Sequence, residues 1–211
     1  MKKFIISLFT LILTSIPVFA EIQPYHTNDI PKSVIGMYQT TTNIKLYQKP
    51  DLKSDIIYDK SWHYKQPLEK DFETLFAVFL PEKELSYLYV TDVDEDWVEV
   101  LYDKKNNLRG WIKKEDEFQF LPWISFYNLY GRKYGLRLLK DSPDSIKGIY
   151  SGTEETSQLI GKIKLPKAIK LTTIRGNWAL VSVLDADRVP KTGFVRWRSK
   201  DGEIYMFPVM K

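Results

Sequence analysis

The feature of this sequence that most restricts its fold is an internal repeat. The segment LYQKPDLKSDIIY (46–58) aligns without a gap to IYSGTEETSQLIG (149–161), at an offset of 103 residues. Tyr47 then matches Tyr150, and both copies continue through a polar, turn-like stretch into apolar residues. A repeat of this kind indicates that one structural unit occurs twice in the chain.

The same order of motifs recurs downstream of each copy. DEDWVEV (94–100) is similar to RGNWALVSV (175–183), because each is a turn followed by Trp and alternating apolar residues. RGWI (109–112) is similar to TGFV (192–195). Alternation of apolar and polar residues between turn signals is typical of β-strands that are buried on one face. Each unit is therefore predicted to be a small β-structure.

This order of motifs resembles the bacterial SH3 domain family, SH3b, over about residues 40–116 and 146–208. The first copy departs from the family by about twenty extra residues between Tyr58 and Leu80, and the second has Phe194 where the family usually has Trp. The resemblance implies an all-β fold of two SH3-like small β-barrels. It also implies that segment 149–161 forms the strand, loop and strand at the start of the second barrel. A phosphate-binding loop is not expected there, because the Gly-rich spacing and the Lys of such loops are missing.

We expect the barrels to be joined by a short aromatic helical linker. Trp123, Phe126 and Tyr130 recur at helical spacing after Pro122. Such an apolar segment is not a flexible spacer, so the ring of Trp123 should be buried between the barrels. The expected parts are an N-terminal arm at 21–39, the first barrel at 40–117 with its insert at about 59–80, the linker at 118–145 and the second barrel at 146–211.

Residues 1–20 are predicted to be a secretory signal peptide. A positive start, an apolar core and small residues before Glu21 indicate cleavage after Ala20. Cleavage removes Lys2 and Lys3 and lowers the formal net charge from +4 to +2, which argues against a nucleic-acid partner. We expect a periplasmic or extracellular protein without a membrane anchor after cleavage.

Residues for catalysis or metal binding are scarce. There is no cysteine, which excludes disulfides, thiolate metal sites, cysteine catalysis and a lipoprotein anchor. His26 and His63 are the only histidines and form no metal-binding motif. The acidic run at 92–96 resembles a calcium loop, but Trp97 occupies the position that requires Gly. We therefore predict no catalytic residue, no metal and no cofactor, and a protein that is not an enzyme.

Aromatic side chains are the candidates for ligand binding. The insert should place Trp62 and Tyr64 in a surface loop of the first barrel, where they would form one side of a site with Tyr47 as its floor. The alternative is that Trp62 folds back as a plug on its own barrel. Tyr150 borders the matching loop of the second barrel, which we expect to be mainly scaffold, and Trp197 lies outside the repeated strand positions.

The resemblance implies an exported, non-enzymatic binding module that recognises a peptidoglycan stem peptide or an envelope protein partner. Two alternatives stay open. A cell-wall enzyme or enzyme subunit would require a closed cleft with two converging carboxylates, whereas a purely architectural envelope protein would show a broad exposed apolar patch.

Overall fold

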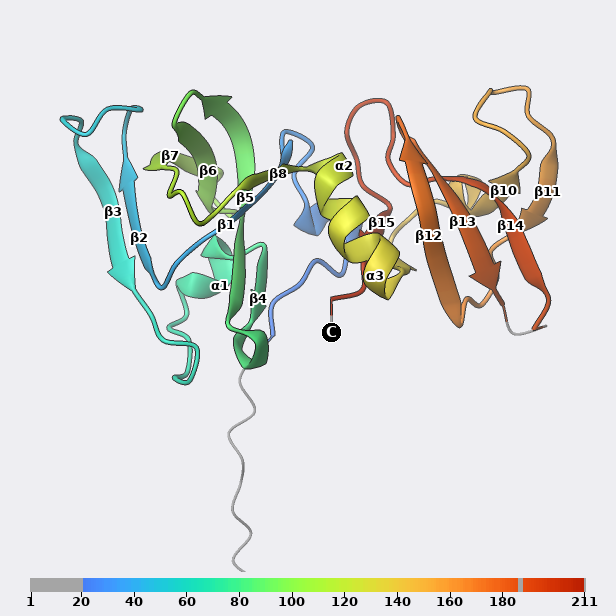
Figure 1. Cartoon of the computed structure of the whole chain (residues 1–211), viewed down its shortest axis with the longest axis horizontal. Coiled ribbons are helices and arrows are strands. Elements are labelled where there is room, and N and C mark those ends of the chain that lie inside the picture. The colour runs from blue at the N-terminus through green and yellow to red at the C-terminus, as the bar shows by residue number, and fades with distance from the viewer. Residues whose placement is uncertain (1–20, 186–187, 211) are drawn as a thin grey trace, which may run out of the picture.

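The computed structural model describes residues 21–185 and 188–210, which form two antiparallel β-sheets on either side of a short helical segment (Figure 1). The predicted signal peptide at 1–20 lies outside the described residues. Among the described residues, no helix has the length and apolarity needed to cross a membrane. The predicted all-β class is confirmed.

The first sheet has the strand order β3-β2-β7-β6-β5-β1-β8, and β4 pairs with β5. Every neighbouring pair is antiparallel. Its strands are β1 (Gly36–Gln39), β2 (Asn43–Tyr47), β3 (Ile56–Ser61), β4 (Val78–Leu80), β5 (Leu85–Asp94), β6 (Trp97–Asp103), β7 (Leu108–Lys113) and β8 (Phe120–Pro122).

The second sheet has the strand order β11-β10-β14-β13-β12-β9-β15. Every second side chain of β13 from Ala179 to Val183 is buried, as expected from the alternation of apolar and polar residues in a strand with one buried face. Its strands are β9 (Leu136–Leu138), β10 (Gly148–Tyr150), β11 (Leu159–Lys162), β12 (Ala168–Arg175), β13 (Trp178–Leu184), β14 (Pro190–Arg196) and β15 (Met206–Pro208).

The two sheets repeat one topology. Apart from β4, each strand of the first sheet has a counterpart in the second that follows in the same chain order and occupies the same place in its sheet. The irregularities repeat as well: the register shifts after Leu46 and after Ile149, and again after Val90 and after Leu171. The duplication in the sequence is therefore a duplication in the structure.

Neither sheet closes on itself through hydrogen bonds between strands. Within the described residues, β3 and β8 at the two edges of the first sheet are not paired, nor are β11 and β15 at the edges of the second. The structure thus shows two open antiparallel sheets where we predicted two SH3-like small β-barrels. A strand that bends strongly at a register shift can curve a sheet without closing its hydrogen-bond ladder.

The predicted helix is present between the sheets. It consists of α2 (Trp123–Phe126), the π-helical turn η3 (Tyr127–Gly131) and α3 (Arg132–Tyr134), and it ends at Gly135, whose φ of +86° favours glycine. The segments on both sides differ from our prediction, because the arm supplies β1 and the linker supplies β8 and β9. The sheets therefore extend beyond the predicted barrel boundaries.

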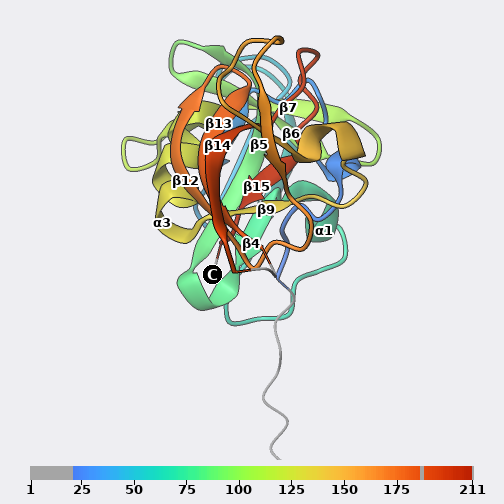
Figure 2. The ribbon, with the colours of Figure 1, turned by 90° about the vertical axis from the view of Figure 1, so that its right-hand side faces the viewer.

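The helical segment and both sheets share one apolar core. Trp123 is 3% exposed, and the rings of Phe126 and Tyr127 are fully buried, as we predicted for this segment. One cluster joins these rings to Met37 and Tyr87 of the first sheet and to several residues of the second. Figure 2, viewed from the side of the second sheet, shows the second sheet in front of the first, with α3 on one side and α1 on the other.

The insert and the N-terminal arm are more ordered than we expected. The insert forms the single helical turn α1 (Phe72–Leu75) and then β4. The arm forms isolated bridges with both halves, at Phe79 and at Lys140. The remaining short helices are η1 (Thr27–Asp29), η2 (Pro81–Lys83) and η4 (Asp144–Lys147).

Candidate binding grooves

An aromatic corner occurs at the same place in both halves. The ring of Tyr47 meets Trp97 edge-on, with centroids 5.5 Å apart and an interplanar angle of 88°. Tyr150 meets Trp178 in the same way, at 5.6 Å and 79°. Each Tyr ends the strand before a polar loop, and each Trp begins the strand after a tight turn. The contact is therefore a product of the repeated topology.

The corner at Trp178 opens onto a hollow with a volume of about 720 Å³, which we call the Tyr150–Trp178 groove. Its two walls are the loop after β10 and the turn between β12 and β13, where Gly176 has a φ of +55°. The lining residues are Thr153, Glu154, Glu155, Thr156, Arg175, Gly176, Asn177, Trp178, Arg196 and Lys200.

Three cations face this groove. The guanidinium group of Arg196 lies over the Trp178 ring, 4.4 Å from its centroid, and Arg175 lies over Phe194 at 5.6 Å. Lys200 Nζ contacts Glu155 Oε1 at 2.6 Å, and this hydrogen bond lowers the pKa of the Glu155 carboxyl. Stacking holds the two guanidinium groups in place while leaving their N–H groups able to donate to a carboxylate.

The hollow beside Tyr47 in the first half is smaller and has a different lining. Its volume is about 330 Å³, and it is lined by Tyr47, Leu52, Ile112 and mainly polar neighbours. Here Trp97 is buried, and the turn at 94–96 is acidic where the second half has Arg175. Trp178 and the turn before it line the hollow of the second half, whereas the lining of the first hollow includes neither Trp97 nor the turn at 94–96.

The structure places Trp62 and Tyr64 against the core. Trp62 is only 5% exposed, and its ring meets Phe72 and Phe76 edge-on at centroid distances of 5.7 and 4.9 Å. Tyr64 stacks on Phe79 at 5.5 Å, and its hydroxyl shares a hydrogen bond of 2.7 Å with Ser86. Our placement of Trp62 in a surface loop is wrong. The apolar surface of α1 buries this ring, and burial of an apolar ring is more favourable than its exposure to water.

Trp197 is also a core residue. Its side chain is fully buried, and its indole Nε1 donates a hydrogen bond of 3.0 Å to the carbonyl oxygen of Gly176. A buried ring cannot contact a ligand at the surface, so Trp197 is no ligand contact in this structure. It instead anchors the turn that forms one wall of the Tyr150–Trp178 groove.

Comparisons with protein-family models, with curated proteins and with solved structures give no match. The two grooves themselves are therefore the basis for a proposed function.

Of the predicted site residues, Tyr47 lines the hollow of the first half, and Tyr150 contacts Trp178, which lines the groove of the second half. The prediction missed Trp178, Arg175, Arg196 and Lys200. A comparison of charge between the two copies would have found part of this site, since Arg175 stands in a turn that is acidic in the other copy. Among the described residues, no group of three or more His, Asp or Glu side chains is placed to hold a metal ion.

Proposed function

We propose that this chain is an exported, non-enzymatic binding protein built from two SH3b-like modules, and that its Tyr150–Trp178 groove recognises a peptidoglycan stem peptide. The observation that carries the proposal is the repeated aromatic corner, which in the second half opens onto a groove with Arg175 and Arg196 held over aromatic rings. A peptide presents a terminal carboxylate and a backbone that such a groove can bind.

The chemistry of this groove supports binding over catalysis. A general acid must hold its proton near neutral pH, which requires a raised carboxyl pKa. The pKa of Glu155 is instead lowered by its hydrogen bond with Lys200, which disfavours the protonated form that a general acid needs. Guanidinium groups recognise carboxylates by paired N–H donors, and Trp178 adds a rigid apolar surface.

An architectural role in the envelope is the second candidate, and one observation favours it. The edge strands β3 and β11 expose consecutive apolar side chains at equivalent positions, Ile56 and Ile57 in one and Leu159 and Ile160 in the other. Exposed edge strands of this type can pair with another chain. Concentration-dependent dimers in sedimentation velocity, abolished by Ile57→Lys with Ile160→Lys, would favour this candidate.

The repeat provides a matched pair of variants for testing the proposed function. Arg196 is the register partner of Trp178, and Lys113 is the register partner of Trp97. We expect Arg196→Ala to lower binding to purified cell-wall sacculi and to a soluble stem peptide by about tenfold, the loss of one charge-assisted contact. Lys113→Ala should bind as the wild type does, with the melting temperature of both variants unchanged.

Isothermal titration calorimetry with the stem peptide measures this difference directly. The proposal fails if the wild-type protein binds neither sacculi nor the stem peptide. It also fails if Arg196→Ala and Lys113→Ala lower the affinity equally. The loss would then come from the lower net charge of the protein and not from a specific contact in the groove.

A further inference from the structure

A second hollow surface lies between α3, β9 and the beginning of β12. It consists of two hollows, of about 660 and 390 Å³. Because they share five lining residues, they form one continuous groove, which we call the basic groove. The shared residues are Leu136, Lys167, Ala168, Ile169 and Val209.

The charged residues of the basic groove are all positive. No Asp or Glu is among its lining residues, and none of its cations makes an ion pair with a carboxylate within the described parts of the chain. Elsewhere on the surface, cations such as Lys60 and Lys147 do pair with carboxylates. The cations of the groove are Arg132, Lys133, Arg137, Lys140, Lys167 and Lys170.

Arg137 shows that the groove lacks a counter-charge. Its side chain donates a hydrogen bond to the carbonyl oxygen of Pro24, but its Nε is buried without a hydrogen-bond partner. Burial lowers the pKa of the guanidinium group. A cation that is partly removed from water gains most from an anion brought into the groove with a ligand.

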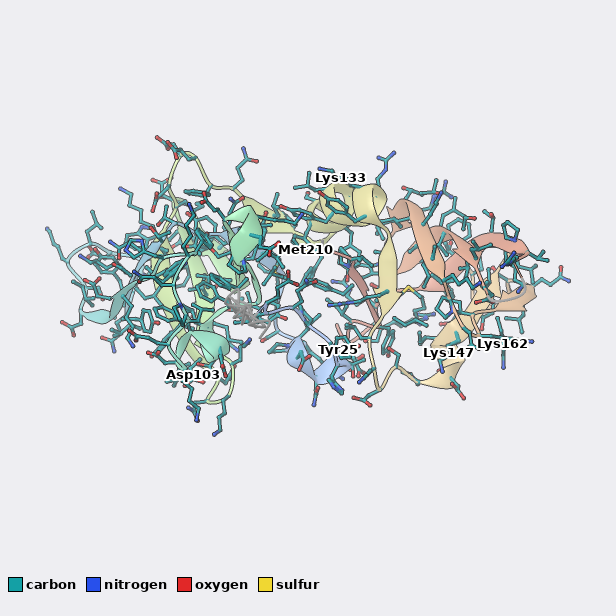
Figure 3. All side chains as sticks on the ribbon, turned by 90° about the horizontal axis from the view of Figure 1, so that it is seen from below. Tyr25, Asp103, Lys133, Lys147, Lys162 and Met210 are labelled. Atoms are coloured by element: carbon teal, nitrogen blue, oxygen red, sulfur yellow. The ribbon has the colours of Figure 1, made fainter. Side chains whose placement is uncertain are left out.

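The floor and one end of the groove are apolar or aromatic. Leu136 and Ile169 form a buried floor. At one end Tyr25 is 52% exposed, and its ring lies under Lys140 at 4.6 Å. Leu165, the most exposed of the large apolar side chains described, at 71%, directly precedes Pro166 of the groove. Figure 3 labels Tyr25 and Lys133, one residue from each hollow.

We propose that the basic groove binds an acidic segment of a partner protein, in which carboxylate side chains alternate with apolar ones. The cations match the carboxylates, and the apolar floor with Leu165 matches the apolar side chains between them. A ligand without apolar side chains, such as polyglutamate, would leave this floor unused. The groove shares no lining residue with the Tyr150–Trp178 groove, so the inference does not rest on the proposed function.

The test uses the protein from residue 21 and a fluorescein-labelled synthetic peptide that alternates Glu with Leu. Fluorescence anisotropy measures its affinity for the wild-type protein and for Lys167→Glu with Lys170→Glu. We expect the double variant to bind at least about tenfold more weakly, and wild-type binding to weaken as salt is raised, because both groove lysines are exposed to screening.

The matched control is Lys65→Glu with Lys70→Glu. It makes the same change of net charge at two exposed positions between β3 and α1, and it should bind as the wild type does. If the double glutamate variant does not fold, as judged by its melting curve, Lys167→Gln with Lys170→Gln replaces it, with the same expected direction.

Three results would overturn the proposal. The first is equal loss of binding in the groove variant and the control variant. The second is competition by polyglutamate as strong as that by the alternating peptide, which would remove the apolar floor from recognition. The third is binding to phosphatidylglycerol vesicles without binding to the peptide, which would assign the groove to a lipid surface.

Discussion

The ring of Tyr127 lies 4.4 Å, centroid to centroid, from the ring of Trp197, and its hydroxyl donates a hydrogen bond to the carbonyl oxygen of Met206. Both contacts tie the helical segment to the second sheet. On the other side, the indole Nε1 of Trp123 donates a hydrogen bond of 2.8 Å to the carbonyl oxygen of Val34, next to the first sheet. The helical segment is therefore a structural part of both halves.

The two halves should unfold as one unit. Trp123→Ala removes a buried ring and its hydrogen bond from the shared core, so we expect it to lower the free energy of unfolding by about 3 to 5 kcal/mol. The measurement is chemical denaturation followed by circular dichroism. Ile124→Ala is the control, because Ile124 is 49% exposed and its loss should have little effect. Two separate transitions that Trp123→Ala leaves unchanged would contradict a shared core.

The equivalent glycines Gly110 and Gly193 should differ in their tolerance of alanine. A Cβ on Gly193 would lie 2.7 Å from the carbonyl oxygen of Tyr150, whereas a Cβ on Gly110 would meet only side chains, at 2.8 Å from Ile57 and 3.0 Å from Leu46. Side chains can move aside more easily than a paired backbone. We therefore expect Gly193→Ala to lower the melting temperature more than Gly110→Ala does, and equal effects would refute this reasoning.

Trp62 should contribute to stability and not to ligand binding. Trp62→Ala removes a ring that is packed against Phe72 and Phe76, so a loss of about 3 to 5 kcal/mol is expected. Tyr64→Phe removes only the hydrogen bond to Ser86 and should cost about 1 kcal/mol. Denaturation curves and sacculus binding are measured on the same samples. Unchanged stability together with lost binding would contradict this prediction and support a role of Trp62 in ligand binding at the surface.

Stability should fall at alkaline pH. Burial, with a smaller contribution from Glu69, raises the pKa of Tyr58 from 10.0 to about 12. Between pH 10 and 12 the hydroxyl therefore ionises in the unfolded chain before it ionises in the folded chain. This ionisation favours the unfolded chain, so the free energy of unfolding falls as the pH rises through 12. Burial raises the pKa of Tyr87 and Tyr127 in the same direction.

Tyr58→Phe isolates the contribution of this residue. The Tyr58 hydroxyl is buried without a hydrogen-bond partner, so its removal should leave stability at pH 7 unchanged or slightly raised. The decline between pH 10 and 12 should become shallower. Tyr134→Phe is the control, because a hydrogen bond from Lys133 lowers the pKa of the exposed Tyr134. A steeper alkaline decline in Tyr58→Phe would show that the assignment is incorrect.

The sequence by itself determined the duplicated β-structure and the buried helical segment. The Tyr, Trp and Gly positions of the two copies are fixed by local patterns, namely alternation in strands and turn residues between them, so they can be read without knowing which strands become neighbours. The helical spacing of Trp123, Phe126 and Tyr130 likewise gave a helix, and its apolar character gave its burial.

Only the tertiary structure decided which aromatic rings reach the surface and where the cations gather. Trp62 is buried because α1, which begins ten residues downstream, packs against it. Trp197 is buried because the linker helix packs against it. The cations of the basic groove come from α3, from β9 and the residues just after it, and from the beginning of β12 and the residue before it; β9 and β12 are neighbours in the sheet. Burial and surface charge depend on contacts between distant segments, and a local sequence pattern carries no record of those contacts.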